Sequence, residues 1–177
     1  RWDLLRSQSN FAVGSSPTSI AFDGANIWVA SASSGNVTKL RASDGVLQGS
    51  FAVGSSPTGV AFDGTNIWVV NQGSDNITKL RASDGALQGT FTVGTSPRGV
   101  AFDGANIWVA NFTSRDVTKL RASDGALQGT FSQPLLNPVG IAFDGTNIWV
   151  AGGGTTFLRA SDGENLGTMS NGKNAVG

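Results

Sequence analysis

The chain consists of short runs in which apolar and polar residues alternate, separated by Gly, Pro, Asn and Asp. In residues 51–93 the runs read PTGVAF, NIWVV, NITKLRA and ALQGTFTV, with Asp63-Gly64 and Asp84-Gly85 between them. Asp-Gly between β-prone runs predicts a hairpin turn, because Gly adopts a positive φ without steric cost. No run keeps the 3.6-residue period of an amphipathic helix. The pattern predicts four short antiparallel strands, over 57–62, 66–70, 76–82 and 86–93.

The same pattern recurs along the whole chain. The segment AFDGANIWVA at 21–30 returns almost unchanged at 61–70, 101–110 and 142–151. The resulting repeat units are 11–50, 51–90, 91–130 and 131–170, with partial units at 1–10 and 171–177. Four short antiparallel strands in about 40 residues are typical of a β-propeller blade, whereas a β-sandwich of unrelated strands would not produce a strict period. We predict one all-β propeller domain over 1–177, with strands A to D running from the innermost to the outermost in each blade.

The two ends of the chain predict an incomplete ring. Arg1 takes the place of the Arg in the recurring KLR, so residues 4–13 are expected to form a leading outer strand. The segment NAVG at 174–177 repeats NPVG at 137–140, where a new strand A would begin. Four blades with a surplus outer strand do not close a ring neatly. Two interpretations stay open: the chain is part of a longer propeller, or two copies join their open flanks into one larger ring.

The stretch SPTGVAFDGTNIWVVNQGSDNITKLRASDGALQGTF resembles the blade repeat of bacterial YncE-like and virginiamycin B lyase-like propellers, which are related to NHL-repeat propellers. The resemblance covers almost the whole chain. It implies the propeller fold and an exported bacterial protein, extracellular or periplasmic. The lyase relies on histidine chemistry, and this chain has no His. No catalytic residue is therefore carried over.

Composition narrows the possible functions. The 12 basic and 12 acidic residues cancel, so the chain lacks the basic excess that binding to nucleic acid requires. No apolar run reaches the roughly 18 residues of a membrane-spanning helix. Cys, His and Tyr are absent, which removes thiolate chemistry, Cys/His metal sites and the commonest general base. We expect no catalytic residues, no cofactor and no metal.

Most of the recurring polar and aromatic residues are expected to be structural. Each Asp of the AFDG segments should cap its own turn rather than join a cation-binding ring. These residues are Asp23, Asp63, Asp103 and Asp144. The Trp and Phe of the same segments should pack between neighbouring blades rather than stack on sugars. They are Trp28, Trp68, Trp108, Trp149, Phe22, Phe62, Phe102 and Phe143. The recurring Lys and Arg of strand C are expected to keep their charges in water and to pair with Asp of the turns.

Variation between the repeats gathers on one side of the predicted propeller. The A–B and C–D turns share one face and are uniform, whereas the B–C and D–A loops share the opposite face and differ from blade to blade. Binding residues often lie on variable loops held by a rigid scaffold. The candidate ligand-binding residues on this face are Arg98, Phe112, Arg115, Asp116, Asn71 and Asn111.

The leading hypothesis is a non-catalytic binding or scaffold module. Its ligand would be a protein, a small molecule or a glycan on the B–C and D–A loops. One alternative is a carboxylate- or metal-dependent lyase or hydrolase, which the absence of His disfavours. The other is a purely structural repeat of a larger surface protein.

Overall fold

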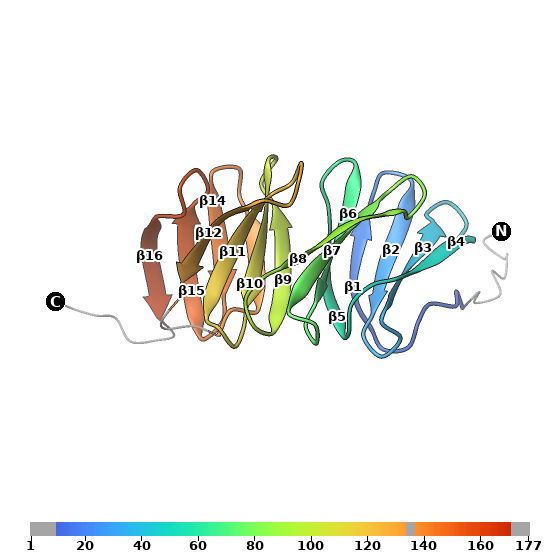
Figure 1. The fold of residues 1–177 in the computed structure, drawn as a ribbon, viewed down its shortest axis with the longest axis horizontal. Coiled ribbons are helices and arrows are strands. Elements are labelled where there is room, and N and C mark those ends of the chain that lie inside the picture. The colour runs from blue at the N-terminus through green and yellow to red at the C-terminus, as the bar shows by residue number, and fades with distance from the viewer. Residues whose placement is uncertain (1–9, 134–136, 171–177) are drawn as a thin grey trace, which may run out of the picture.

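Four four-stranded antiparallel sheets, one per repeat, stand side by side in the computed structural model (Figure 1), which describes residues 10–133 and 137–170. Blade 1 comprises β1 (Pro17–Phe22), β2 (Asn26–Ser31), β3 (Asn36–Arg41) and β4 (Leu47–Ala52). Blade 2 comprises β5 (Pro57–Phe62), β6 (Asn66–Asn71), β7 (Asn76–Arg81) and β8 (Leu87–Thr92). Blade 3 comprises β9 (Pro97–Phe102), β10 (Asn106–Asn111), β11 (Asp116–Arg121) and β12 (Leu127–Ser132). Blade 4 comprises β13 (Gly140–Phe143), β14 (Asn147–Ala151), β15 (Gly154–Arg159) and β16 (Asn165–Ser170).

The strands predicted from the sequence are confirmed to within a residue or two. Each sheet pairs its strands in chain order, for example β5-β6-β7-β8, so every connection within a blade is a hairpin. This alternation places the A–B and C–D turns at one end of the sheets and the B–C and D–A loops at the other (Figure 1). The predicted Asp-Gly turns are present, with Gly64 at φ 95° and Gly85 at φ 75°.

The hydrophobic core lies between the blades. Strands β1, β5, β9 and β13 contact one another in sequence, which makes strand A the inner strand as predicted. Between blades 1 and 2, Trp28 of β2 packs with Ile67, Val69 and Leu80 of the next blade. Trp68 and Trp108 form the corresponding clusters at the next two interfaces. Each blade thus covers the tryptophan of the blade before it.

This arrangement leaves the two end blades only partly covered. Trp28, Trp68 and Trp108 are fully buried, whereas Trp149 in the last blade is half-buried. At the other end, Phe22 is 56% exposed, while Phe62, Phe102 and Phe143 are half-buried against the preceding blades. The predicted packing role therefore holds at the three internal interfaces but not for Phe22, which has no preceding blade among the described residues.

The leading outer strand predicted over 4–13 lies mostly outside the described residues, and residues 10–13 form no strand. The repeat of NPVG at 174–177 also lies outside them. Within residues 10–133 and 137–170, no helix has the length and apolar character needed to cross a bilayer.

Candidate ligand-binding face

The B–C and D–A loops form one connected surface. In blade 2, the backbone N–H groups of Gln72 and Gly73 donate to the carbonyls of Ser56 and Ser55, both at 3.0 Å. The Ser74 hydroxyl accepts a hydrogen bond from Ser55 N at 2.7 Å. Ser56 has a positive φ of 49°, a conformation that non-glycine residues adopt mainly when tertiary contacts fix it. The loops are therefore held mainly by backbone contacts and by the hydroxyl of Ser74.

Arg98 and Phe112 meet on this face. Arg98 is the second residue of β9, and Phe112 follows β10 in the B–C loop of the same blade. The guanidinium carbon lies 3.8 Å from the centre of the Phe112 ring, which is a close cation–π contact. Arg98 Nε is buried and has no hydrogen-bond partner among the described residues.

The same position carries a different role in the earlier blades. Thr18 donates its hydroxyl hydrogen to the Pro57 carbonyl at 2.7 Å, and Thr58 donates to the Pro97 carbonyl at 3.2 Å. Each threonine thus links its inner strand to the next one. Arg98 replaces this link with a side chain that carries charge to the loop face.

Arg115 is the second cation of the face. It is exposed and has a positive φ of 57°, as does the corresponding Asp75 at φ 52°. The Asp75 carboxylate accepts a hydrogen bond from Ser96 N of the next blade at 2.8 Å. Within the described residues, neither Arg98 nor Arg115 forms an ion pair.

Asn71, Asn111 and Asp116 belong to the packing of the strand ends. Both asparagines are fully buried, so the expectation that they offer amides to a ligand is not met. Asn111 Nδ2 donates to Asp116 Oδ1 at 2.6 Å and to Thr118 Oγ1 at 2.8 Å, and Asn71 makes the equivalent contacts. Of the six candidates, the structure brings Arg98 to Phe112 and leaves Arg115 exposed nearby in the same B–C loop as Phe112.

The uniform face confirms the structural role of the repeated aspartates. Asp63 Oδ1 accepts hydrogen bonds from the backbone N–H groups of Thr65 and Asn66, and Oδ2 accepts one from Trp68 Nε1 at 2.7 Å. Burial raises the pKa of Asp63, but the hydrogen bonds from Trp68, Asn66 and Thr65 lower it by more, so the pKa lies below its ordinary value. The bond to the indole also orients the tryptophan, a role that the sequence did not reveal.

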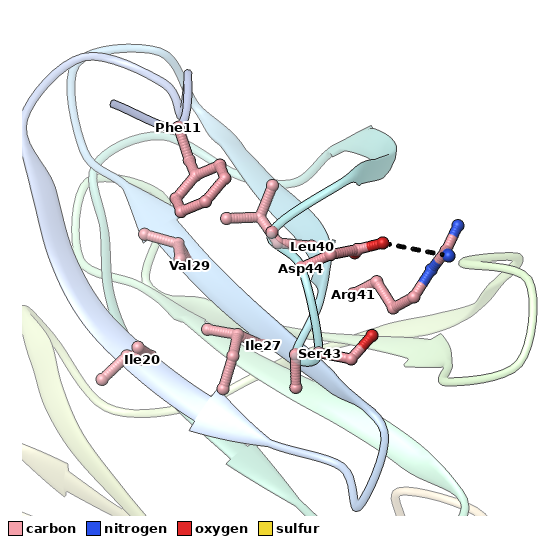
Figure 2. A pocket seen from close by; sticks show the side chains of 10 residues that line it. Phe11, Ile20, Ile27, Val29, Leu40, Arg41, Ser43 and Asp44 are labelled. Atoms are coloured by element: carbon pink, nitrogen blue, oxygen red, sulfur yellow. Dashed lines mark hydrogen bonds and ion pairs between the residues drawn. The ribbon is translucent and has the colours of Figure 1, made fainter. Parts of the chain in front are cut away.

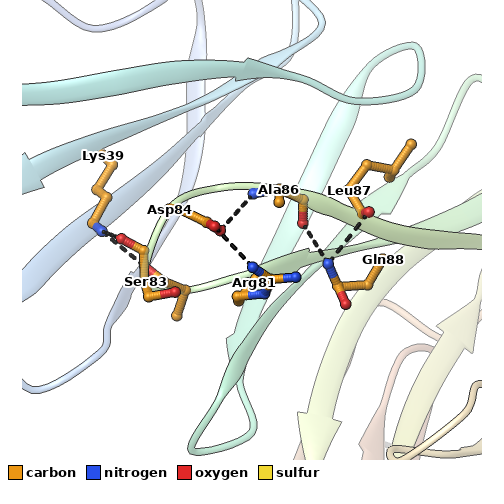
Figure 3. A network of polar contacts seen from close by, with 8 residues as sticks. Lys39, Arg81, Ser83, Asp84, Ala86, Leu87 and Gln88 are labelled. Carbon is orange, nitrogen blue, oxygen red and sulfur yellow. Dashed lines mark hydrogen bonds and ion pairs between the residues drawn. The ribbon is translucent and has the colours of Figure 1, made fainter.

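The expectation that the strand C lysines keep their charges in water is wrong. Lys39 is 7% exposed, and its Nζ donates to the carbonyls of Ala82 and Ser83 in the next blade at 2.7 and 3.0 Å (Figure 3). The same ammonium lies 5.2 Å from the centre of the Trp28 ring. The register pairs Trp28 with Lys39, so the recurrence of Lys opposite Trp was the available signal. The arginines behave as expected, since each pairs with the Asp of its own C–D turn. These pairs are Arg41–Asp44, Arg81–Asp84, Arg121–Asp124 and Arg159–Asp162.

No cluster of three or more His, Cys, Asp or Glu side chains occurs in the described part of the chain. The two carboxylates available on the loop face, Asp75 and Asp116, accept internal hydrogen bonds. The carboxylate- or metal-dependent alternative stays an untested prediction.

Comparison with known proteins identifies the fold by structure and not by sequence. No protein-family model matches the sequence, and no curated protein sequence matches it. Solved propeller structures do match by shape. A structure of hydrazine synthase from Kuenenia stuttgartiensis aligns with 94% of this chain and 52% of its own, at 17% identity and a TM-score of 0.79. The chain folds as half of a β-propeller.

Two further matches have the same extent. The WD40 repeats of RRP9 align with 88% of this chain and 53% of their own, at 16% identity and a TM-score of 0.77. A streptogramin B lyase aligns with 89% of this chain and 55% of its own, at 18% identity and a TM-score of 0.74. This chain therefore spans about half the length of the solved chains it matches. Identities this low carry the fold and no activity.

Proposed function

We propose that the chain is a non-catalytic binding or scaffold module of an exported bacterial propeller protein, with blades of the YncE-like and virginiamycin B lyase-like type. Its ligand binds the B–C and D–A loop face at blade 3. The ligand carries an anionic group that Arg98 and Arg115 recognise.

The contrast among the cationic side chains supports this proposal. In the described residues, the recurring lysines donate hydrogen bonds to backbone carbonyls, and the recurring arginines form ion pairs with turn aspartates. Arg98 and Arg115 depart from the repeat and form no ion pair there. Both lie on the loop face; Arg98 packs on the half-buried ring of Phe112, and Arg115 lies three residues after Phe112 in the same B–C loop. Guanidinium groups without an ion-pair partner suit the recognition of a carboxylate or another planar anion.

Binding of a labelled hexaglutamate peptide tests the proposed chemistry. We expect the wild-type chain to bind this peptide more tightly than hexaglutamine at low salt. Arg98→Glu and Arg115→Glu should each weaken binding at least tenfold, because loss of one charged contact costs roughly 1.5–3 kcal/mol. Fluorescence polarisation measures the affinities.

The matched control is Arg41→Glu, which makes the same charge change on the uniform face. This variant should bind the peptide like the wild type. Equal weakening by Arg41→Glu and Arg98→Glu would reduce the effect to net charge and refute the site. The melting temperature of the Arg115 variant should stay near the wild-type value, since this exposed side chain forms no ion pair within the described residues. Arg98→Glu also loses the cation–π contact with Phe112, worth about 0.5–1 kcal/mol, so its melting temperature should fall by only a few degrees.

A further inference from the structure

Blade 1 exposes an apolar flank that the other blades keep covered. Ile20 is 64% exposed, whereas the corresponding Val60 of blade 2 is 8% exposed. Ile27 and Val29 are half-buried, whereas Ile67 and Val69 are fully buried. Ile20, Ile27, Val29 and Leu40 line an open groove of about 330 Å³ on this flank of blade 1 (Figure 2).

The three internal interfaces show what fits such a groove. In each, the tryptophan of the preceding blade lies against the isoleucine, valine and leucine of the next. Beside Trp28, the cluster at the first interface also takes in Ala30 and Val37 of blade 1. The surface complementary to the blade 1 groove is therefore a strand B and C face that carries an uncovered tryptophan.

Within the described residues, blade 4 carries the one uncovered face of this kind. Trp149 is half-buried, Ala151 is exposed, and Met169 is 53% exposed. They correspond to Trp28, Ala30 and Phe51 of blade 1. Phe157 stands where Lys39 stands in blade 1, and its ring stacks on Trp149 with 5.0 Å between the centres. This face is therefore more apolar than its internal counterparts, which suits docking onto another molecule.

We propose that two copies of this chain associate head to tail, with blade 4 of each copy covering blade 1 of the other. Blade 4 cannot cover blade 1 of the same chain, because the two blades lie at opposite ends of the row (Figure 1). The chain superposes on 52% to 55% of the solved propeller chains at TM-scores of 0.74 to 0.79, so its four blades follow the arc of about half of those chains. Two copies would then close a ring and cover both apolar flanks. A contact between two different surfaces gives a closed ring only when the rotation from one copy to the next returns to the starting copy.

Phe11 takes part in this contact. Its ring lies against Gly45 as the Phe51 ring lies against Gly85. Phe11 thus fills the place at Gly45 that corresponds to that of Phe51, so the partner's Met169, which is also a counterpart of Phe51, lies outside it. Trp149 and Ala151 of the second copy occupy the remainder, over Ile20, Ile27 and Val29.

Sedimentation velocity of the 177-residue chain tests the proposal. We expect a species of twice the 18.1 kDa mass of one chain. Ile20→Asp damages only the blade 1 flank and Ala151→Asp only the blade 4 flank, and each should raise the dissociation constant of the dimer at least tenfold. Both side chains are exposed in the single chain, so the variants should fold. Leu87→Asp is the control, because Leu87 is also 64% exposed but lies on the outer strand of blade 2.

A mixture of the two variants distinguishes head-to-tail from symmetric pairing. The mixed dimer keeps one intact interface, between blade 4 of the Ile20→Asp chain and blade 1 of the Ala151→Asp chain. Mixing should therefore restore part of the dimer that each variant alone has lost. A monomeric wild type would overturn the proposal. Weakening by only one of the two variants would overturn head-to-tail pairing, and polymers that grow with concentration would overturn the two-copy ring.

Discussion

Each internal tryptophan is held from several sides by residues of its own blade. Trp68 donates its indole N–H to Asp63 at 2.7 Å, and Lys79 Nζ lies 5.1 Å from its ring centre. Phe91 packs with its ring centre 5.6 Å away, and Lys79 also donates to the Ala122 carbonyl of the next blade. Trp68 thus contacts its A–B turn through Asp63 and its own sheet through Lys79 and Phe91, and it lies at the interface with the next blade. This concentration of contacts explains why Asp, Trp, Lys and Phe recur together.

Replacement of a buried tryptophan should cost far more than replacement of the half-buried one. We expect Trp68→Ala to lower the free energy of unfolding by about 3–5 kcal/mol, the usual loss for a buried large aromatic residue. Trp149→Ala should cost about 1–2 kcal/mol, because its ring loses less buried area. Urea unfolding measures both, in the Ile20→Asp background so that no partner covers Trp149. A cost below about 1 kcal/mol for Trp68→Ala would contradict the interface role.

Some residue roles could be predicted from the sequence and others could not. Asp63 and Trp68 could be assigned to turn and core, because Asp before Gly and a large aromatic in a strand have local explanations. Lys79 could not, because the carbonyls it reaches belong to the next blade, 43 residues further along the chain. The buried amides of Asn71 and Asn111 were misplaced for a similar reason. Their partners lie across a hairpin, and only the register brings them together.

Among the elements, the C–D turn takes part in the packing between blades and the A–B turn does not, although both contain Asp-Gly. The turn at Gly85 receives the Phe51 ring of the preceding blade, so a Cβ there would overlap that ring. At Gly64 a Cβ would meet nothing within 4 Å. Both glycines have a positive φ, of 75° and 95°. The two turns therefore share the backbone requirement and differ only in the contact between blades.

This difference yields a paired prediction. Gly64→Ala should cost about 1–2 kcal/mol, the penalty for a left-handed backbone in a residue with a Cβ. Gly85→Ala carries the same penalty and must also displace Phe51, so we expect a total of about 2–5 kcal/mol. Thermal or urea unfolding of the two variants measures the difference. Equal costs would show that the Phe51 contact contributes nothing.

The strands and turns were predictable from the sequence because their signals repeat four times and are local. The loops were less so. Their variability indicated a candidate face, but the contact of Arg98 in β9 with Phe112 in the B–C loop depends on the pairing of β9 with β10. The half-ring shape follows from the number of repeats. The match between the Trp149 face and the Ile20 groove became visible only when the exposure of equivalent residues was compared between blades.

At the scale of the whole molecule, the two proposals reinforce each other. Successive blades face the same way, so a head-to-tail ring of two copies would present both Arg98 sites on one side. A ligand with two anionic groups could then bind both copies, and its avidity would exceed the affinity of a single site. The uniform face would carry no such pair.

Acid should destabilise the whole molecule through its turn aspartates. The pKa lies below the ordinary value of 3.8 for seven of them, which are Asp23, Asp63, Asp84, Asp103, Asp124, Asp144 and Asp162. A carboxyl whose pKa is lower in the folded state stabilises that state above its unfolded pKa, and the contribution disappears as the pH falls through the folded pKa. We therefore expect stability that is steady from about pH 7 to pH 5 and falls between about pH 4 and pH 2.

Asp144 allows this cause to be isolated. The hydrogen bond from Trp149, with those from Asn147 and Thr146, lowers the pKa of Asp144 to about 2. Asp144→Asn should therefore give a shallower loss of stability between about pH 4 and pH 2 than the wild type, followed by urea unfolding at each pH. Because its partners are hydrogen-bond donors without charge, the difference should persist in about 0.5 M NaCl, which screens exposed ion pairs. A difference that vanishes in salt would assign the effect to surface charge instead of to the hydrogen bonds of the turn.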